Sequence, residues 1–391
     1  MKRKKISIIT GSRAEWGLFY PLAHELKKRK NAFQLSIVSS GAHLSSKHGL
    51  TYREIEKDGF SIDEKVRFAV SDDSERALAL TAGDAVKGFT RALDKLKPHL
   101  VMLLGDRFEI FAAAAASLFL RIPIAHIHGG ELTEGSIDDP LRHSITKMSS
   151  FHFVSSEIYR KRVIQMGEEP STVFNVGALG LDNIMGTKLL DRSAFTEKTG
   201  FEFGKHNVVV TFNPSTAEDP AVSERQLANL LNALDLFDGA KMIFTKPNPD
   251  IYSSRLAGMI DSYVGRNRKR AMAFDSMGRV LYLSALNLMD LVAGNSSSGI
   301  IEAPFFSKPT VNIGDRQKGR IRVPSIIDTP GESVDEIKGA IRRAFSDGFT
   351  AICREVRSPY GNGGTAQKIA EILETVNIVP VRKRFYDIDF K

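Results

Sequence analysis

The chain has 391 residues, more than one hydrophobic core usually supports, so its length predicts two domains. A formal net charge of +8 without a long basic tract favours an anionic small molecule as the partner and argues against nucleic acid. The single cysteine, Cys353, excludes an intrachain disulfide and a cysteine-based metal site, and no apolar run reaches membrane-spanning length, so we expect a cytoplasmic protein without a membrane partner.

Short strand-like runs alternate with amphipathic patterns through the first half of the chain. The expected strands are residues 6–10, 34–39, 100–104, 124–127, 151–154 and 172–176. The expected helices are residues 18–28, 74–96, 108–120, 141–148 and 157–166. This alternation predicts a parallel sheet with helices on both faces.

A second alternating series begins near Asn207. Its expected strands are residues 208–212, 241–244, 271–273, 289–293 and 310–313, and its expected helices are residues 224–237, 251–263, 280–285 and 334–345. Residues 177–205 lack a strand pattern and are interpreted as the interdomain connection. The expected fold class is therefore α/β, with two Rossmann-like domains facing a central cleft lined by the carboxyl ends of the strands.

The first polar motif, GSRAEWG at residues 11–17, directly follows the first expected strand. A glycine turn there exposes backbone N–H groups to an anion, and the Arg13 guanidinium would clamp phosphate oxygens. The alternative is an ordinary strand-to-helix turn with a surface arginine.

Two further motifs follow the next apolar strands. Asp106 and Arg107 come after residues 100–104, where Asp106 would be either a helix N-cap or a catalytic group. His128, Glu131 and Asp138 come after residues 124–127. Carboxylates and imidazoles gathered on one rim supply an acid and a base near neutral pH.

The spacing of His126 and His128 predicts that both side chains lie on the same face of that strand. A metal site is disfavoured because no fixed ligand spacing is present. A polar loop with helix caps is the remaining alternative.

Serine residues dominate the second half's most polar motif. Ser296, Ser297 and Ser298 are expected to begin a helix whose N-terminus binds an anion, with Glu302 in the first turn. Four further residues are expected to line the ligand site: Asn213, Asn248, Tyr282 and Arg320. Tyr282 would stack on a base or belong to the core.

The motifs together resemble the hydrolysing UDP-N-acetylglucosamine 2-epimerases of sialic-acid and related nonulosonic-acid synthesis. The stretches that carry the resemblance run in family order: GSRAEWG, GDRFE, HIHGGELTEG, DDPLRHSITKMS, VGALGLDNI, GNSSSGIIEAP and NIGDRQKGRIR. The resemblance implies a fold like that of the GT-B glycosyltransferases. It also implies domains at residues 1–178 and 179–362, with a helix in residues 363–391 that packs back on the first domain.

The resemblance further implies a reaction without a cofactor. UDP leaves by anti elimination after a proton is removed from sugar carbon 2, and water then adds to the glucal, giving N-acetylmannosamine and UDP. Asp106, Glu131 and Asp138 match acidic positions of the family's catalytic region, and the resemblance implies a catalytic role for them. The nucleotide-diphosphate and ribose positions match Arg13, Arg107, Ser296, Ser297, Ser298 and Glu302, with Asn248 a weaker match.

Two positions depart from the commoner family pattern. His128 stands where relatives often have glutamate, and Asn213-Pro214 stands where they often have His-Pro. The HIHGGE variant also resembles the legionaminic-acid group, whose sugar is a 2,4-diacetamido-2,4,6-trideoxyglucose carried by UDP or GDP. His128 is expected to share proton transfer, with a purely hydrogen-bonding role as the alternative.

The rival functions are a GT-B glycosyltransferase and a non-catalytic nucleotide-sugar sensor. The expected partners are a nucleotide-sugar substrate and further copies of the chain in a homo-oligomer.

Overall fold

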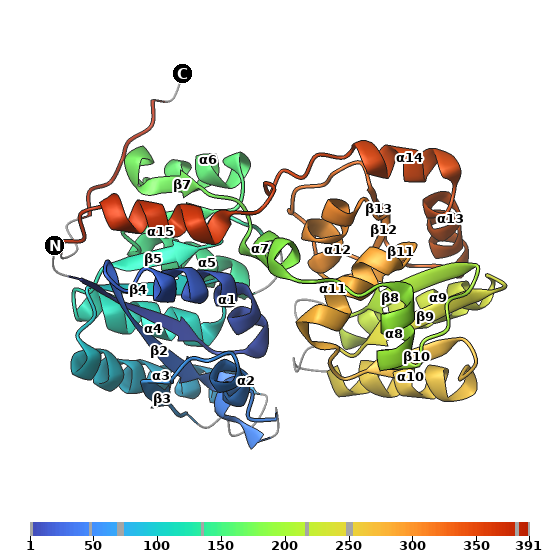
Figure 1. Ribbon diagram of the computed structural model, residues 1–391, viewed down its shortest axis with the longest axis horizontal. Coiled ribbons are helices and arrows are strands. Elements are labelled where there is room, and N and C mark those ends of the chain that lie inside the picture. Colours follow the sequence, from blue (N-terminus) through green and yellow to red (C-terminus); the bar gives the residue numbers. More distant parts are fainter. Residues whose placement is uncertain are drawn as a thin grey trace. The chain divides into compact units, whose positions relative to one another are not determined.

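The computed structural model describes residues 3–46, 49–68, 74–133, 137–215, 219–247, 253–379 and 383–389. The chain divides into two compact units (Figure 1). Unit 1 comprises Met1–Glu131, Ile137–Asn183 and Gly363–Lys391, and unit 2 comprises Leu132–Ser136 and Ile184–Asn362. Within the described residues, no helix is both long and apolar enough to cross a membrane.

The described strands of unit 1 form one parallel sheet in the order β3-β2-β1-β4-β5-β6-β7, which confirms the predicted fold class. The strands are β1 (Lys4–Thr10), β2 (Phe33–Ser40), β3 (Glu64–Val66), β4 (Leu100–Leu104), β5 (Ile124–Ile127), β6 (Phe151–Val154) and β7 (Val173–Asn175). The sequence did not predict β3, because this edge strand has three residues and two of them are charged.

Helices cover both faces of this sheet. They are α1 (Arg13–Lys28), α2 (Tyr52–Lys57), α3 (Glu75–Leu96), α4 (Phe108–Phe119), α5 (Asp138–Met148), α6 (Glu157–Gln165) and α15 (Thr365–Thr375), with 3-10 turns at Gly41–Leu44 and Pro170–Thr172. One core joins the sheet to α1 and α15 through Phe19 and Ile369. The other core joins it to α3, α4 and α5 through Phe89, Ala113 and Ile145.

Helix α15 is fastened to unit 1 at both of its ends. The Asp182 carboxylate accepts hydrogen bonds from the backbone N–H groups of Thr365 (2.9 Å) and Ala366 (2.6 Å). At the other end, Lys4 Nζ donates to the carbonyls of Leu373, Glu374 and Val376 at 2.7–2.8 Å. A carboxylate at the N-terminus and an ammonium at the C-terminus both complement the helix dipole.

The described strands of unit 2 form a second parallel sheet in the order β10-β9-β8-β11-β12-β13. They are β8 (His206–Thr211), β9 (Ala240–Thr245), β10 (Ala271–Phe274), β11 (Leu291–Gly294), β12 (Thr310–Ile313) and β13 (Ile326–Thr329). Its helices are α8 (Arg192–Thr199), α9 (Pro220–Asp235), α10 (Ser253–Arg266), α11 (Gly278–Leu288), α12 (Ser298–Ile301), α13 (Val334–Ala344) and α14 (Asp347–Glu355), with a 3-10 turn at Ala303–Phe306.

Two apolar clusters of unit 2 again lie on opposite faces of the sheet. One includes Leu227, Ile260 and Phe349, from α9, α10 and α14. The other includes Phe195 and Ala285, from α8 and α11. The sequence did not predict strand β13 or helix α14.

The segment interpreted as a connection, residues 177–205, contains α8 and one further helix, α7 (Leu179–Gly186). The boundary between the units falls between Asn183 and Ile184, because the first half of α7 packs in unit 1. Leu179 belongs to the α1–α15 core, and Asn183 Nδ2 donates to the Gly17 carbonyl at 2.7 Å.

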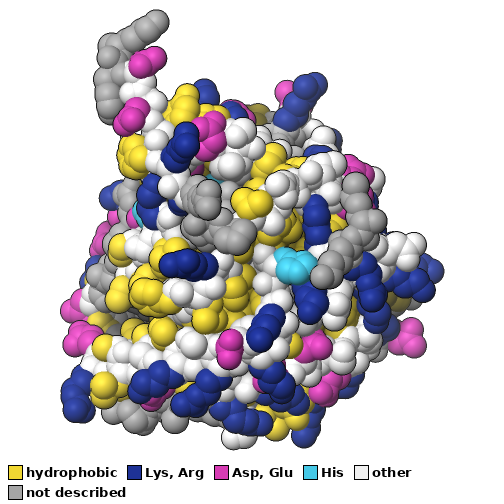
Figure 2. Space-filling view, turned by 90° about the vertical axis from the view of Figure 1, so that its left-hand side faces the viewer, with side chains coloured by type: hydrophobic (Ala, Val, Ile, Leu, Met, Phe, Trp, Pro, Cys, Tyr) yellow, Lys and Arg dark blue, Asp and Glu magenta, His cyan; other side chains and the backbone are white. Residues whose placement is uncertain are grey.

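Figure 2 shows how charge is spread over one face of the molecule. Lys and Arg side chains are scattered among acidic and hydrophobic ones on this face. The net charge of +8 is not gathered there into a single basic stripe of the kind that tracks a nucleic-acid backbone.

Candidate functional site

The polar residues of unit 1 gather at one edge of its sheet. Strands β1, β4, β5 and β6 are parallel, so the residues that follow their carboxyl ends lie at the same edge. Those following residues are Gly11, Gly105, His128 and Ser155. The edge therefore collects three of the predicted motifs.

His126, the last but one residue of β5, is a buried structural group. Its Nε2 lies 2.8 Å from the Gly105 carbonyl oxygen and its Nδ1 lies 3.0 Å from Thr146 Oγ1. A carbonyl only accepts, so Nε2 carries the proton and Nδ1 accepts from the threonine hydroxyl. Burial lowers the pKa of the imidazole to about 3, so His126 is neutral at physiological pH.

His128 does not share a strand face with His126, and that prediction is wrong. Strand β5 ends at Ile127, and His128 has a left-handed backbone with φ of 65°. The chain turns there, so the alternation of a strand no longer applies. His128 Nδ1 instead lies 2.9 Å from Glu131 Oε1, and its buried Nε2 has no hydrogen-bond partner among the described residues.

Glu131 is held at the centre of this cluster. The same Oε1 accepts a hydrogen bond from Ser155 Oγ at 2.9 Å, and the residue is 2% exposed. Ser155 follows β6 and was not among the predicted site residues. Ser155 reaches Glu131 because β6 lies beside β5 in the sheet, and the sequence does not reveal this strand order.

Asp106 forms an ion pair with the buried Arg142 of α5. Residue 107, not Asp106, is the N-cap of α4, so the capping alternative for Asp106 is wrong. Asp138 begins α5, and Arg142 is four positions further along, which places both on one face of the helix. All three predicted catalytic acids therefore lie in unit 1. Asp106 follows β4, Glu131 lies in the loop after β5, and Asp138 opens α5.

Two buried carboxylates beside Arg107 were missed by sequence reasoning. Arg107 Nε lies 2.7 Å from Glu109 Oε1 and 3.8 Å from Glu15 Oε1. Burial, with Glu109 as a second cause, raises the pKa of Glu15 to about 8, although the Gly11 N–H donates to this carboxylate at 2.7 Å. Both residues lie inside the GSRAEWG and GDRFE motifs, but the spacing of these motifs gives no sign that the two carboxylates are buried.

Asparagines shape the corresponding edge of unit 2. Asn213, after β8, and Asn295, after β11, exchange two hydrogen bonds: Asn213 N donates to Asn295 Oδ1 at 2.7 Å, and Asn295 Nδ2 donates to the Asn213 carbonyl at 2.8 Å. Gly294 is required here, since its φ is 128° and a Cβ would lie 2.0 Å from the Thr211 carbonyl oxygen. Asn213 thus fixes the loop geometry through its backbone.

The serine motif forms a compact hydroxyl cluster. Helix α12 begins at Ser298 with Ser297 as its N-cap, as predicted. Ser298 Oγ bonds Ser296 Oγ at 3.1 Å and also bonds the Tyr282 hydroxyl. Burial raises the pKa of Tyr282 to about 12, which keeps this hydroxyl a hydrogen-bond donor.

Glu302 lies after α12 and not in its first turn, which corrects the prediction. The helix has four residues and gives way to the 3-10 turn that contains Pro304. Burial raises the pKa of Glu302 to about 7, so its protonation changes near neutral pH.

The remaining predicted residues are Arg13, Arg320 and Asn248. Arg13 is the exposed first residue of α1, and Arg320 is partly buried in the loop after β12. Asn248 lies outside the described residues. No group of three or more metal-ligating side chains occurs within the part of the chain that the structure describes.

Comparison with known proteins identifies the family. The UDP-N-acetylglucosamine 2-epimerase family pattern matches residues 24–374. A GDP/UDP-N,N'-diacetylbacillosamine 2-epimerase (hydrolyzing) from Campylobacter jejuni is 40% identical over 86% of this chain and 87% of the relative. The chain belongs to the UDP-N-acetylglucosamine 2-epimerase family.

Other family members extend this similarity. A UDP-N,N'-diacetylbacillosamine 2-epimerase (hydrolyzing) from Legionella pneumophila is 34% identical over 95% of this chain and 96% of the relative. The solved structure of UDP-GlcNAc 2-epimerase from Neisseria meningitidis, bound to UDP-GlcNAc, matches with a TM-score of 0.81 at 15% identity. It covers 94% of this chain and 99% of that one, and the match supports the GT-B-like fold.

Proposed function

We propose that this family member is a hydrolysing 2-epimerase of nucleotide-activated N,N'-diacetylbacillosamine, carried by UDP or GDP. Two relatives at 40% and 34% identity carry that activity in their names, and both are matched over most of their length. This sugar is the 2,4-diacetamido-2,4,6-trideoxyglucose that the HIHGGE variant suggested as an alternative. We therefore prefer it to UDP-N-acetylglucosamine.

The observation that carries the proposal is the Glu131–His128–Ser155 cluster, with the Asp106–Arg142 pair at the same edge of the sheet. A carboxylate and an imidazole in contact can pass a proton between substrate and protein. His128 Nε2 is a buried ring nitrogen without a described partner, so it is suited to meet a ligand. A glycosyltransferase would not require this arrangement of acids and imidazole, and that alternative is not favoured.

In the proposed reaction, a base of this cluster removes the proton from sugar carbon 2. The C–H electrons form the second bond of the double bond between carbons 1 and 2, and the bond from carbon 1 to the nucleotide oxygen breaks. The nucleoside diphosphate leaves with that electron pair. Water then adds to the glucal: its oxygen joins carbon 1 and a proton returns to carbon 2 on the opposite face.

Isotope labelling tests the proposed function. The protein is incubated in deuterated water with a panel of UDP- and GDP-linked sugars and no acceptor, and the products are followed by proton NMR. We expect release of the nucleoside diphosphate and a manno-configured free sugar with one solvent deuterium at carbon 2. Nucleotide release with protium retained at carbon 2 would contradict the elimination route, and turnover only with an acceptor would support a glycosyltransferase.

Arg13 and the serine cluster are proposed to bind the nucleotide diphosphate. Arg13 is an exposed cation at the start of α1, and the Ser297 hydroxyl makes no capping hydrogen bond to its own helix. Arg13→Ala and Ser297→Ala should each weaken nucleotide affinity by about tenfold to a hundredfold, since a charged hydrogen bond contributes about 1.5–3 kcal/mol. Calorimetry with UDP and GDP measures this, and unchanged affinity in both variants would remove these residues from the site.

A further inference from the structure

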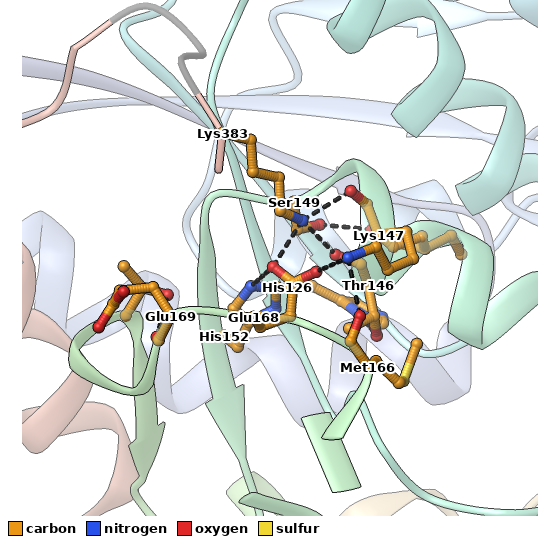
Figure 3. Close-up of polar contacts among 11 residues, drawn as sticks. His126, Thr146, Lys147, Ser149, His152, Met166, Glu168, Glu169 and Lys383 are labelled. Atoms are coloured by element: carbon orange, nitrogen blue, oxygen red, sulfur yellow. Dashed lines mark hydrogen bonds and ion pairs between the residues drawn. The ribbon is translucent and has the colours of Figure 1, made fainter. Parts of the chain in front are cut away.

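The C-terminal segment, residues 383–389, contacts the rest of unit 1 through Lys383, Phe385 and Tyr386. The Lys383 ammonium donates to the Lys147 carbonyl at 2.6 Å and the Thr146 carbonyl at 3.2 Å, and it pairs with Glu168 Oε2 at 2.6 Å (Figure 3). Two residues on, the Phe385 ring lies where a Cβ on Gly167 would be, with 2.4 Å between the two. Tyr386 N donates to the Gly167 carbonyl at 3.0 Å.

Glu168 is the buried centre of this attachment. Its side chain is 1% exposed and contacts three basic groups from three elements: Lys147 Nζ of α5 at 2.6 Å, His152 Nε2 of β6 at 2.9 Å, and Lys383 Nζ of the tail. A buried carboxylate is stable only when its charge is paired and hydrogen-bonded. The tail therefore completes a charge cluster that begins inside the fold.

The carbonyls that Lys383 contacts belong to the last turn of α5. Carbonyls in the last turn of a helix lack partners within the helix and carry partial negative charge. An ammonium at this position is favourable against the helix dipole, and it adds to the Ser149 N–H, which donates to the Thr146 carbonyl at 3.0 Å. The opposite end of the same helix begins with Asp138, and its middle supplies Arg142 to Asp106.

Thr146 contacts both the C-terminal segment and a residue next to the candidate site. Its backbone carbonyl accepts from Lys383, and its hydroxyl donates to His126 Nδ1. His126 in turn holds the Gly105 carbonyl, and Gly105 precedes Asp106. A displacement of the last turn of α5 would therefore reach the loop that carries Asp106.

We propose that residues 383–389 form a strap that holds α5 in register with the sheet edge, with Lys383 as a positioning residue for Asp106 and Arg142. This inference rests on the proposed function, because it takes Asp106 as part of the reacting site. The strap supplies no group to the chemistry. Its effect should appear in turnover more than in substrate binding.

The test compares Lys383→Met, Lys383→Arg and the surface control Lys30→Met in the full-length protein. Lys383→Met should lower kcat about ten- to a hundredfold, the size expected when reacting groups move by about 1 Å, with KM within about twofold. Lys383→Arg keeps the charge and should recover most of kcat. A kcat of Lys383→Met within twofold of the natural protein would overturn the proposal.

Measurements on the protein without substrate test the strap independently of the proposed function. The ring nitrogen resonances of His126 should shift in Lys383→Met, and amides at the end of α5 should exchange faster with solvent, while Lys30→Met changes neither. If the natural protein releases nucleotide from no sugar tested, the function fails, but these two signals still decide on the strap. Unchanged His126 resonances would contradict it.

A second variant covers the case in which Lys383→Met does not fold. Phe385→Ala removes the ring that lies on Gly167 and 5.0 Å from Lys147 Nζ, and it substitutes none of the three partners of Glu168. It should shift the His126 resonances and lower kcat in the same direction as Lys383→Met. If both stay as in the natural protein, the strap is overturned.

Discussion

Glu131→Gln should lower kcat by about 10²–10⁴-fold, the range that one acid–base group contributes. The amide retains an oxygen that can accept from Ser155 Oγ, but it no longer accepts a proton at neutral pH. Nucleotide affinity should stay within about twofold, because Glu131 lies at the sheet edge of unit 1 and is proposed to act on the sugar. The measurements are steady-state nucleotide release and calorimetry with UDP.

Glu157→Gln is the matched control for this substitution. Glu157 begins α6 in the same unit, and its 3.4 Å ion pair with Arg160 is exposed. Exposed pairs contribute about 0–1 kcal/mol, so this variant should keep full turnover. Full activity in Glu131→Gln would remove the residue from proton transfer.

Substitutions of His128 distinguish a role in proton transfer from a role in orienting Glu131. If the imidazole shares proton transfer, His128→Asn should lower turnover while UDP still binds. His128→Glu should recover part of the turnover and move the acidic limb of the rate profile to lower pH, since a carboxyl ordinarily titrates about two pH units below an imidazole. If His128 only orients Glu131 through its 2.9 Å contact, His128→Asn should retain most turnover.

Glu168→Gln should destabilise unit 1 by about 3–5 kcal/mol, the usual cost of removing one partner from a buried ion pair. The substitution keeps the size of the side chain but leaves Lys147, His152 and Lys383 without their shared negative charge. The single tryptophan, Trp16, is buried in unit 1 and provides a fluorescence signal for this unit in urea. The exposed control Glu157→Gln should change the midpoint little.

The pH dependence of stability provides a second test of this prediction. Burial by itself would raise the pKa of Glu168, but the hydrogen bond and charge of His152 and the hydrogen bonds from Lys147 and Lys383 outweigh it and lower the pKa from 4.5 to about 2. A carboxyl with a depressed folded-state pKa stabilises the fold above its unfolded value of 4.5, and this stability is lost as pH falls towards 2. The stability gap between the natural protein and Glu168→Gln should therefore be constant above about pH 5 and shrink by pH 3. A gap that is independent of pH would show that the carboxylate charge is not responsible.

The sequence alone determined the fold class and the family. Strands β4, β5, β6 and β12 are short, apolar runs bounded by polar or turn residues, and their bounds were predicted to the residue. The family motifs predicted the acids at positions 106, 131 and 138, and the structure shows that each follows a strand or opens a helix. Local pattern was sufficient there because strand–helix alternation and turn chemistry act over a few residues.

Only the tertiary structure decided how those residues are held. His126 and His128 do not share a strand face, because the backbone turns at His128. Glu302 lies outside the first turn of α12, because that helix ends at Ile301. Burial raised the pKa of Glu15, and strand order brought Ser155 to Glu131. The contact of Lys383 with Glu168 joins residues more than two hundred positions apart. Sequence periodicity carries no information on such distant pairs, because their approach is fixed by packing and strand order and not by local propensity.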